Sequence, residues 1–148
     1  MCGGFAMPIR NGYADDLYIV TSGEMMSLYA ADNILRAVRY QVRPGYAKFK
    51  GLIVNKKNIE NEDQIVEKAA KEMDANIFYT IERDKKIQEA EKLKMTVCEA
   101  FKDSKISHDY LMLAKNSPIS SKVLSGFILD IKLSIALLIF ITASSISC

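Results

Sequence analysis

Short apolar runs alternate with amphipathic stretches over residues 17–100 of the chain. The apolar runs are rich in strand-forming residues and predict three buried strands, at residues 17–20, 51–54 and 77–81. The stretches that follow them carry apolar residues at helical spacing and predict three helices, at residues 25–38, 63–73 and 86–93. Strands and helices in alternation are typical of a parallel sheet with right-handed crossovers. The pattern therefore predicts an α/β fold.

The first two predicted helices each have an apolar face. The face of the first helix is predicted to contain Met25, Leu28, Tyr29, Ile34, Leu35 and Val38. The face of the second is predicted to contain Ile65, Val66, Ala69, Ala70 and Met73. Thr21 and Glu24 precede the first helix at the spacing of a capping box, and this spacing predicts where the helix begins.

The segments directly after the strands are the candidate binding segments. In an open parallel sheet, ligands gather beyond the carboxyl ends of the strands. The candidates are residues 21–24, 55–58 and 82–88.

The composition changes near the C-terminus. A further amphipathic stretch at 109–115 ends the region that is expected to form one domain, residues 1–116, and residues 117–148 form an atypical apolar tail. No charged residue follows Lys132. A membrane span needs about 20 apolar residues, so the tail is too short to favour one. Three interpretations stay open: a buried terminal element, a marginal tail anchor, and an end that is not native to this fold.

Charge and cysteine usage exclude several classes of protein. The net charge of +2 comes from mixed signs with no basic stripe, which argues against nucleic acid as a partner. Cys2, Cys98 and Cys148 lie far apart without a C-x-x-C motif, which excludes a self-contained zinc or ferredoxin-type site. With no disulfide framework and no signal peptide expected, the predicted compartment is the cytoplasm. Cys98 has a strand-like Thr-Val-Cys context and is predicted to lie in the core.

Cys2 is followed by two glycines, which place a soft thiolate on backbone that turns tightly. This chemistry suits an iron–sulfur cluster. A small buried residue and a terminal thiol are the alternatives for Cys2 taken alone.

Six segments resemble the nitrogenase iron protein family, also called dinitrogenase reductase. They are Cys2–Arg10, Tyr18–Ile34, Gly51–Asn55 and the motifs Arg83-Asp84, Gln88-x-Ala90-Glu91 and Met95-Thr96-Val97. The match runs in order from Cys2 to about Lys115 and corresponds to the C-terminal part of the family. The resemblance implies the C-terminal part of a P-loop NTPase-type parallel sheet flanked by helices.

The resemblance also implies a function and a set of site residues. Members of the family are homodimers that hold one [4Fe–4S] cluster between their subunits, bind MgATP and pass single electrons to a larger partner protein. Cys2 matches the second of the two cluster cysteines. Arg10 resembles a surface residue near the docking face for the partner, and its alternative is a solvated charge. Asn55 matches the position that contacts adenine, and its alternative is a turn residue at the end of a strand.

Asp84, Gln88 and Glu91 match the segment of the family that faces adenine and ribose. Their spacing predicts that they share one helix face, and a solvated face is the alternative. Glu82 stands where the family usually has proline, and Lys85 with Lys86 replaces less charged residues, so the family's nucleotide affinity or preference does not carry over directly to this chain.

The sequence contains no G-x-x-x-x-G-K-[ST] motif after any of its seven glycines. Without this loop nothing cradles the β- and γ-phosphates, so we expect no ATP hydrolysis by this polypeptide alone, and we assign no catalytic residue. One cysteine per subunit gives a dimer two of four cluster ligands. Two alternative functions stay open: a related reductase of chlorophyll or nickel-tetrapyrrole synthesis, and a non-catalytic remnant or binding module.

Overall fold

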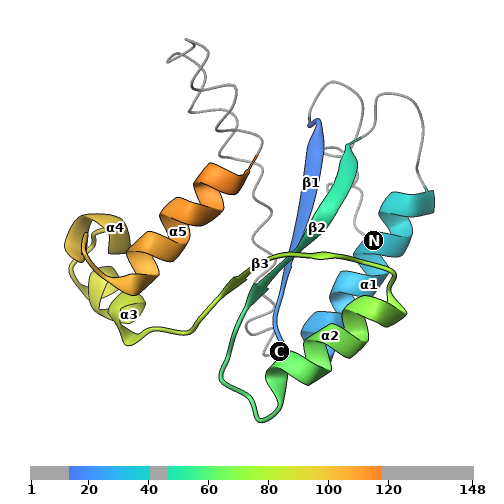
Figure 1. Ribbon diagram of the computed structural model, residues 1–148, viewed down its shortest axis with the longest axis horizontal. Coiled ribbons are helices and arrows are strands. Elements are labelled where there is room, and N and C mark those ends of the chain that lie inside the picture. Colours follow the sequence, from blue (N-terminus) through green and yellow to red (C-terminus); the bar gives the residue numbers. More distant parts are fainter. Residues whose placement is uncertain (1–13, 41–46, 118–148) are drawn as a thin grey trace, which may run out of the picture. The chain divides into compact units, whose positions relative to one another are not determined.

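The computed structural model describes residues 14–40 and 47–117 of the chain (Figure 1). The chain divides into two compact units at the bond between Thr80 and Ile81. The cysteine predicted to bind a cluster, Cys2, and the docking residue Arg10 lie outside the described residues, as does the tail from residue 118 onward.

From Asp16 to Ile81 the chain alternates between strands and helices. The elements are β1 (Asp16–Thr21), α1 (Met25–Tyr40), β2 (Lys48–Asn55), α2 (Glu62–Glu72) and β3 (Ile77–Ile81). The strand order is β1-β2-β3, and β1 pairs with β2 in parallel. Each element corresponds to a predicted one within a few residues, so the predicted α/β fold class is confirmed.

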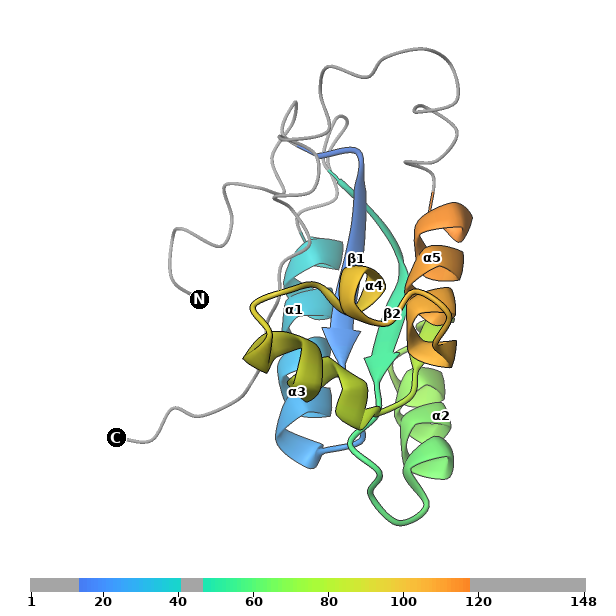
Figure 2. The same ribbon diagram turned by 90° about the vertical axis from the view of Figure 1, so that its left-hand side faces the viewer.

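One aliphatic core joins the two helices to the first two strands. Figures 1 and 2 show α1 and α2 on the same side of the sheet. The core consists of Ile19, Leu28, Ala31, Leu35, Leu52, Ala70 and Met73. Most of these side chains recur at helical or strand spacing, which explains why the sequence predicted them. Burial of a Leu or Ile side chain contributes about 1.5–3 kcal/mol, so this core supplies much of the stability of the unit.

Two side chains of α1 depart from the predicted apolar face. Met25 is 76% exposed and Tyr29 is 65% exposed, although both were expected to face inward. The buried apolar residues of α1 are Leu28, Ala31, Leu35 and Val38. At helical spacing Met25 and Tyr29 lie to one side of this stripe. The prediction was wrong for these two residues because it took the apolar face to be wider than the part of the helix that packs on the sheet.

A bulge bends β2 near its start. Tyr18 of β1 lies opposite Gly51, whereas Leu17 lies opposite Phe49, so Lys50 is an extra residue on β2. Gly51 has φ +155°, and a Cβ there would lie 2.8 Å from Nδ2 of Asn76. Glycine is required here because both the backbone angle and the close approach of the neighbouring strand exclude a side chain.

The second unit consists of helices within its described residues. They are α3 (Lys85–Lys92), α4 (Val97–Ala100) and α5 (Lys105–Asn116), and α4 packs against both of the others. The hydroxyl of Ser107 is fully buried and lies 3.0 Å from the carbonyl oxygen of Val97 and 2.6 Å from that of Phe101, so its one proton is shared between these two acceptors. It therefore ties the start of α5 to both ends of α4.

The strand-like context of Cys98 was misleading. Thr96 is the N-cap of α4 and forms a capping box with Glu99, so the Thr-Val-Cys segment begins a helix. Cys98 is half-buried, with its Sγ 3.9 Å from the carbonyl oxygen of Ser107. The predicted core position was wrong because a four-residue helix is too short to show helical periodicity.

Over residues 14–40 and 47–117, the structure contains no helix with the length and apolar character needed to cross a membrane.

Candidate functional site

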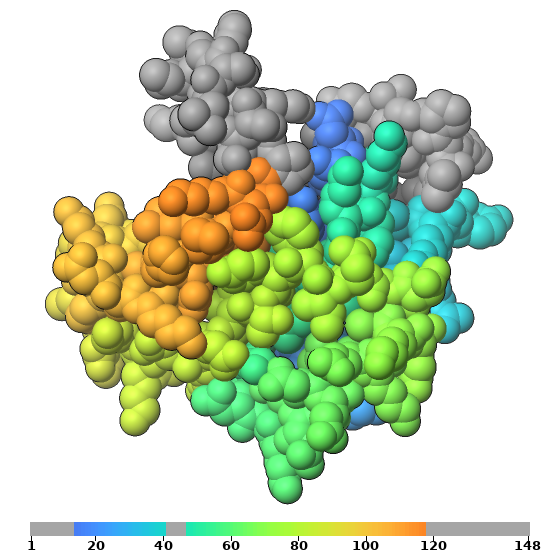
Figure 3. Space-filling view, viewed as in Figure 1, coloured from blue at the N-terminus to red at the C-terminus, as the bar shows by residue number. Residues whose placement is uncertain are grey.

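The carboxyl ends of β1 and β2 bring two loops together. Thr21, the last residue of β1, lies opposite Val54, and β2 ends one residue later at Asn55. We call residues 22–24 the β1 loop and residues 56–61 the β2 loop. The middle of the β2 loop is exposed and lies at the surface of the first unit, in green at the lower edge of Figure 3. This is the edge of the sheet at which ligands were expected.

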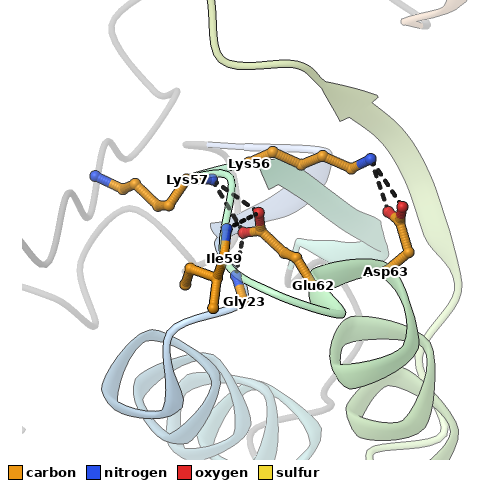
Figure 4. A network of polar contacts seen from close by, with 6 residues as sticks. All are labelled: Gly23, Lys56, Lys57, Ile59, Glu62 and Asp63. Atoms are coloured by element: carbon orange, nitrogen blue, oxygen red, sulfur yellow. Dashed lines mark hydrogen bonds and ion pairs between the residues drawn. The ribbon is translucent and has the colours of Figure 1, made fainter.

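A buried carboxylate connects the two loops. Glu62 is 5% exposed, and its Oε1 accepts hydrogen bonds from the backbone N–H of Gly23 at 2.9 Å and of Lys57 at 3.0 Å. Its Oε2 accepts from the N–H of Lys57 at 3.1 Å and of Ile59 at 3.2 Å. Figure 4 shows the carboxylate between these donors. One side chain therefore holds segments that are 39 residues apart in the sequence.

These hydrogen bonds keep the carboxylate ionised. Burial raises the pKa of Glu62, but hydrogen bonds from the backbone of Lys57, Gly23 and Ile59, with a smaller effect of the Asn58 backbone, outweigh burial and hold the pKa below its ordinary value of 4.5. Glu62 is also the first residue of α2, where the positive end of the helix dipole favours a negative charge. The charge is thus stabilised by backbone dipoles at both oxygens.

The β2 loop turns through two asparagines. Asn58 has φ +61° and Asn61 has φ +56°, both in the left-handed region that asparagine tolerates better than most residues. The turns direct the N–H groups of Lys57 and Ile59 toward one point, and such converging amides form an anion-binding concavity. Here the anion is the chain's own Glu62.

Gly23 is required by the position of Glu62. A Cβ on residue 23 would lie 2.5 Å from Cγ of Glu62 and 2.9 Å from its Oε1. Contacts this short do not occur between real side chains, so any larger residue must displace the carboxylate.

The β1 loop is organised by serines rather than by the predicted capping box. The Oγ of Ser27 accepts from the N–H of Ser22 at 3.0 Å and lies 3.1 Å from Oγ1 of Thr21. The Oγ of Ser22 accepts from the N–H of Glu24 at 3.4 Å. A capping box with Thr21 as the N-cap would begin the helix at Ser22, whereas α1 begins at Met25 and the hydroxyl of Thr21 lies against that of Ser27. The predicted capping box was therefore wrong.

An ion pair closes the other side of the β2 loop. Nζ of Lys56 lies 2.8 Å from Oδ1 and 3.0 Å from Oδ2 of Asp63 (Figure 4). The Lys56 side chain is 15% exposed and that of Asp63 is 71% exposed. Solvent screening reduces the contribution of such a pair to the stability.

Asn55 occupies the position predicted for it, at the carboxyl end of β2. Its side chain is half-buried, and no hydrogen bond joins it to any other residue within the described part of the chain. An amide carries both donors and an acceptor, so Asn55 retains its capacity to bind a ligand edge.

The other predicted nucleotide residues lie in the second unit. Asp84 is the N-cap of α3, with extended backbone, and its Oδ1 accepts from the N–H of Lys86 at 2.9 Å. Gln88 and Glu91 lie on α3 one turn apart, and both are exposed. The prediction that all three share a helix face was wrong for Asp84. A capping residue lies outside the helix, and its side chain folds back over the first turn.

Sequence reasoning missed Glu62 and its packing against Gly23. The available signals were a glycine after a strand and an acidic residue at the start of a helix. Neither signal identifies the partner, because the donors to Glu62 are backbone N–H groups that every residue except proline possesses.

The described residues form no metal-binding cluster. Over 14–40 and 47–117, no three side chains of His, Cys, Asp or Glu come together as a metal site. The predicted cluster ligand, Cys2, is not among those residues.

Two comparisons relate the chain to known proteins. Residues 1–134 match the protein-family model described as "4Fe-4S iron sulfur cluster binding proteins, NifH/frxC family". Because the match covers most of the chain, the chain belongs to this family.

A solved structure of a ParA family ATPase from Chlorobium tepidum TLS is also similar, with a TM-score of 0.53 and 22% sequence identity. The similarity covers 64% of this chain and 38% of that chain, so this chain spans well under half the length of that protein. The fold is therefore of the P-loop NTPase type, as predicted.

Proposed function

We propose, from its membership of the NifH/frxC family, that this chain supplies the C-terminal part of a nitrogenase-type iron protein. Such a protein passes single electrons from a [4Fe–4S] cluster to a larger partner protein in the cytoplasm. In the proposed working form, two copies of the chain face each other across the cluster, and residues 1–116 contribute the iron-protein domain.

The proposal that the chain binds nucleotide rests mainly on the position and the hydrogen bonding of the Asn55 side chain. Its amide lies at the carboxyl end of a parallel strand, where α/β proteins bind nucleotides, and makes no hydrogen bond within the described residues. A loop anchored by a buried carboxylate follows it directly. A donor and an acceptor held in this manner suit the edge of a purine base.

Three side chains of the second unit match the family segment that faces adenine and ribose, and we propose that this segment binds nucleotide. Oδ1 of Asp84 is engaged by the N–H of Lys86, which fixes the orientation of the carboxylate and leaves its other oxygen for a hydroxyl group. Gln88 and Glu91 are exposed one turn apart, so an amide and a carboxylate are available on the same helix. Carboxylates accept hydrogen bonds from ribose hydroxyls, which gives these residues a role in holding the sugar.

The cluster part of the proposal rests on Cys2 and on the family. When bound, a [4Fe–4S] cluster supplies one-electron redox chemistry. Cys2 would provide a thiolate ligand, and the backbone of Gly3 and Gly4 would provide N–H groups that tune the potential through hydrogen bonds. Arg10 would contribute to docking of the partner protein.

Nucleotide binding is tested by titrating the purified 148-residue chain with a fluorescent ATP analogue. Asn55→Ala is expected to weaken binding about 10-fold, the effect of losing one to two net hydrogen bonds. Asn116→Ala, at the exposed end of α5, removes the same group and is expected to leave the affinity unchanged. Equal affinity of Asn55→Ala and the wild type would refute the role of Asn55.

Cluster binding is tested by anaerobic reconstitution with iron, sulfide and a small thiol that supplies the two ligands a dimer lacks, followed by iron analysis and electron paramagnetic resonance. Cys2→Ser is expected to abolish incorporation, and Cys148→Ser is the matched control. Incorporation that survives Cys2→Ser would contradict the assignment. In the same preparations we expect no magnesium-dependent ATP hydrolysis, because the chain contains no phosphate-cradling loop.

A further inference from the structure

Glu62 has no role in the proposed contacts to nucleotide or cluster, yet it is the most highly coordinated buried charge in the described part of the chain. Its two oxygens accept four hydrogen bonds from three backbone N–H groups, between 2.9 and 3.2 Å. Burying a charge is costly unless it is satisfied by hydrogen bonds. The arrangement is therefore a built feature of the carboxyl edge and needs a physical role.

The hydrogen bonds to Glu62 fix the path of the backbone after Asn55. Lys57, two residues beyond Asn55, donates to both oxygens of the carboxylate, and Ile59 donates to one. The third donor, Gly23, belongs to the β1 loop. The carboxylate thus ties the start of the β2 loop to a neighbouring strand end.

We propose that Glu62 is a positioning residue for purine recognition: its carboxylate fixes the β2 loop against the β1 loop and so holds the amide of Asn55 in one orientation. This inference rests on the proposed nucleotide binding at Asn55. The physical gain is preorganisation, since a loop ordered before binding does not lose conformational freedom when the base arrives. Glu62 touches no nucleotide and acts only through Asn55.

The first experiment compares Glu62→Gln with Glu67→Gln, which makes the same change on an exposed position of the same helix. Glutamine keeps the shape and one acceptor but turns an NH₂ group toward backbone donors. Fluorescent ATP and GTP analogues serve as probes. Glu62→Gln is expected to raise the ATP dissociation constant about 10-fold and to reduce the preference for ATP over GTP, whereas Glu67→Gln changes neither.

The ratio of the ATP affinity to the GTP affinity distinguishes a positioning role of Glu62 from a general loss of stability. Partial unfolding weakens both probes by one factor and leaves their ratio unchanged. A double-mutant cycle gives the same distinction: in an Asn55→Ala background, Glu62→Gln is expected to have little further effect on ATP affinity. An unchanged ATP-to-GTP ratio, or additive effects in the cycle, would overturn the proposal.

Amide hydrogen exchange, measured without nucleotide, tests whether Glu62 holds the β1 loop and the β2 loop together. The amides of Gly23, Lys57 and Ile59 are expected to exchange at least 10-fold faster in Glu62→Gln, with no change in Glu67→Gln. Unchanged exchange would refute the anchoring role even if affinity falls. If the wild type binds neither probe, the proposed nucleotide function fails and the positioning role fails with it, while exchange still reports whether Glu62 orders the loops.

Gly23→Ala provides a second route should Glu62→Gln not fold, because the added methyl displaces the carboxylate from the side of the β1 loop. It is expected to produce the same loss of ATP-over-GTP preference. Retention of the wild-type preference in Gly23→Ala would count against the proposal.

Discussion

Both units contain buried hydroxyl groups that bond locally, but within the described residues only the first unit also buries a charged side chain. In the first unit, the Glu62 carboxylate joins two loops that are distant in sequence and carries a full charge. In the second, the neutral hydroxyls of Ser104 and Ser107 connect residues no more than 10 positions apart. The first arrangement depends on the whole sheet being assembled, whereas the second is nearly local. We therefore expect the first unit to respond more strongly to loss of its central group.

The largest effect is expected from Glu62→Ala. Removal of the side chain leaves the N–H groups of Gly23, Lys57 and Ile59 without their acceptor, and one such unsatisfied group costs about 1–3 kcal/mol. Because water reaches part of the vacated space, we expect a total loss of about 3 kcal/mol in the free energy of unfolding. Urea unfolding followed by circular dichroism measures it. Glu67→Ala is the control, and equal losses in the two variants would disprove the difference.

Gly23→Ala is expected to rank next. The new Cβ would lie 2.5 Å from Cγ of Glu62, and overpacking of this kind costs about 1–3 kcal/mol. The cost arises from the Glu62 side chain, so it should largely vanish in a Glu62→Ala background. Urea unfolding of the two single variants and the double variant tests this coupling, and simple additivity would contradict the contact.

Ser107→Ala probes the second unit. Its hydroxyl is fully buried and shares its one proton between the carbonyl oxygens of Val97 and Phe101, so removal is expected to cost about 1–2 kcal/mol. Ser117→Ala, which removes an exposed hydroxyl bonded to Ala114, is expected to cost less than about 0.5 kcal/mol. Urea unfolding compares the two. A loss for Ser107→Ala larger than that for Glu62→Ala would reverse the ranking of the two units.

The pH dependence of stability gives the finest comparison. The pKa of Glu62 is lower in the folded protein than its ordinary value of 4.5, so its contribution is complete above that value and is lost as pH falls through the folded pKa. Glu62→Gln is therefore expected to flatten the acid loss of stability below about pH 4.5. Urea unfolding at a series of pH values measures this effect.

Glu99 supplies the matched case in the second unit. Its pKa is also lowered, by hydrogen bonds from the side chain and backbone of Thr96, but its carboxylate is solvent-exposed. Solvent screening weakens this contribution, so Glu99→Gln is expected to change the acid slope less than Glu62→Gln. A larger change in the acid slope for Glu99→Gln than for Glu62→Gln would show that burial of the carboxylate does not determine the size of the effect.

Sequence reasoning was most successful where neighbouring residues decide the structure. The strands and helices between Asp16 and Lys92 were predicted within a few residues because apolar periodicity is a local signal. Asn55 was found as the end of β2 for the same reason. The short α4 was missed, since four residues carry no readable period.

What the amino-acid sequence determined by itself is the order of elements, the apolar stripe along each helix and the family to which the chain belongs. Only the tertiary structure decided that Met25 lies in solvent and that Glu62 binds the two loops. Periodicity is a property of the order of side chains along the chain, whereas the width of the buried helix face and the partner of a backbone N–H are determined only when distant segments have packed together.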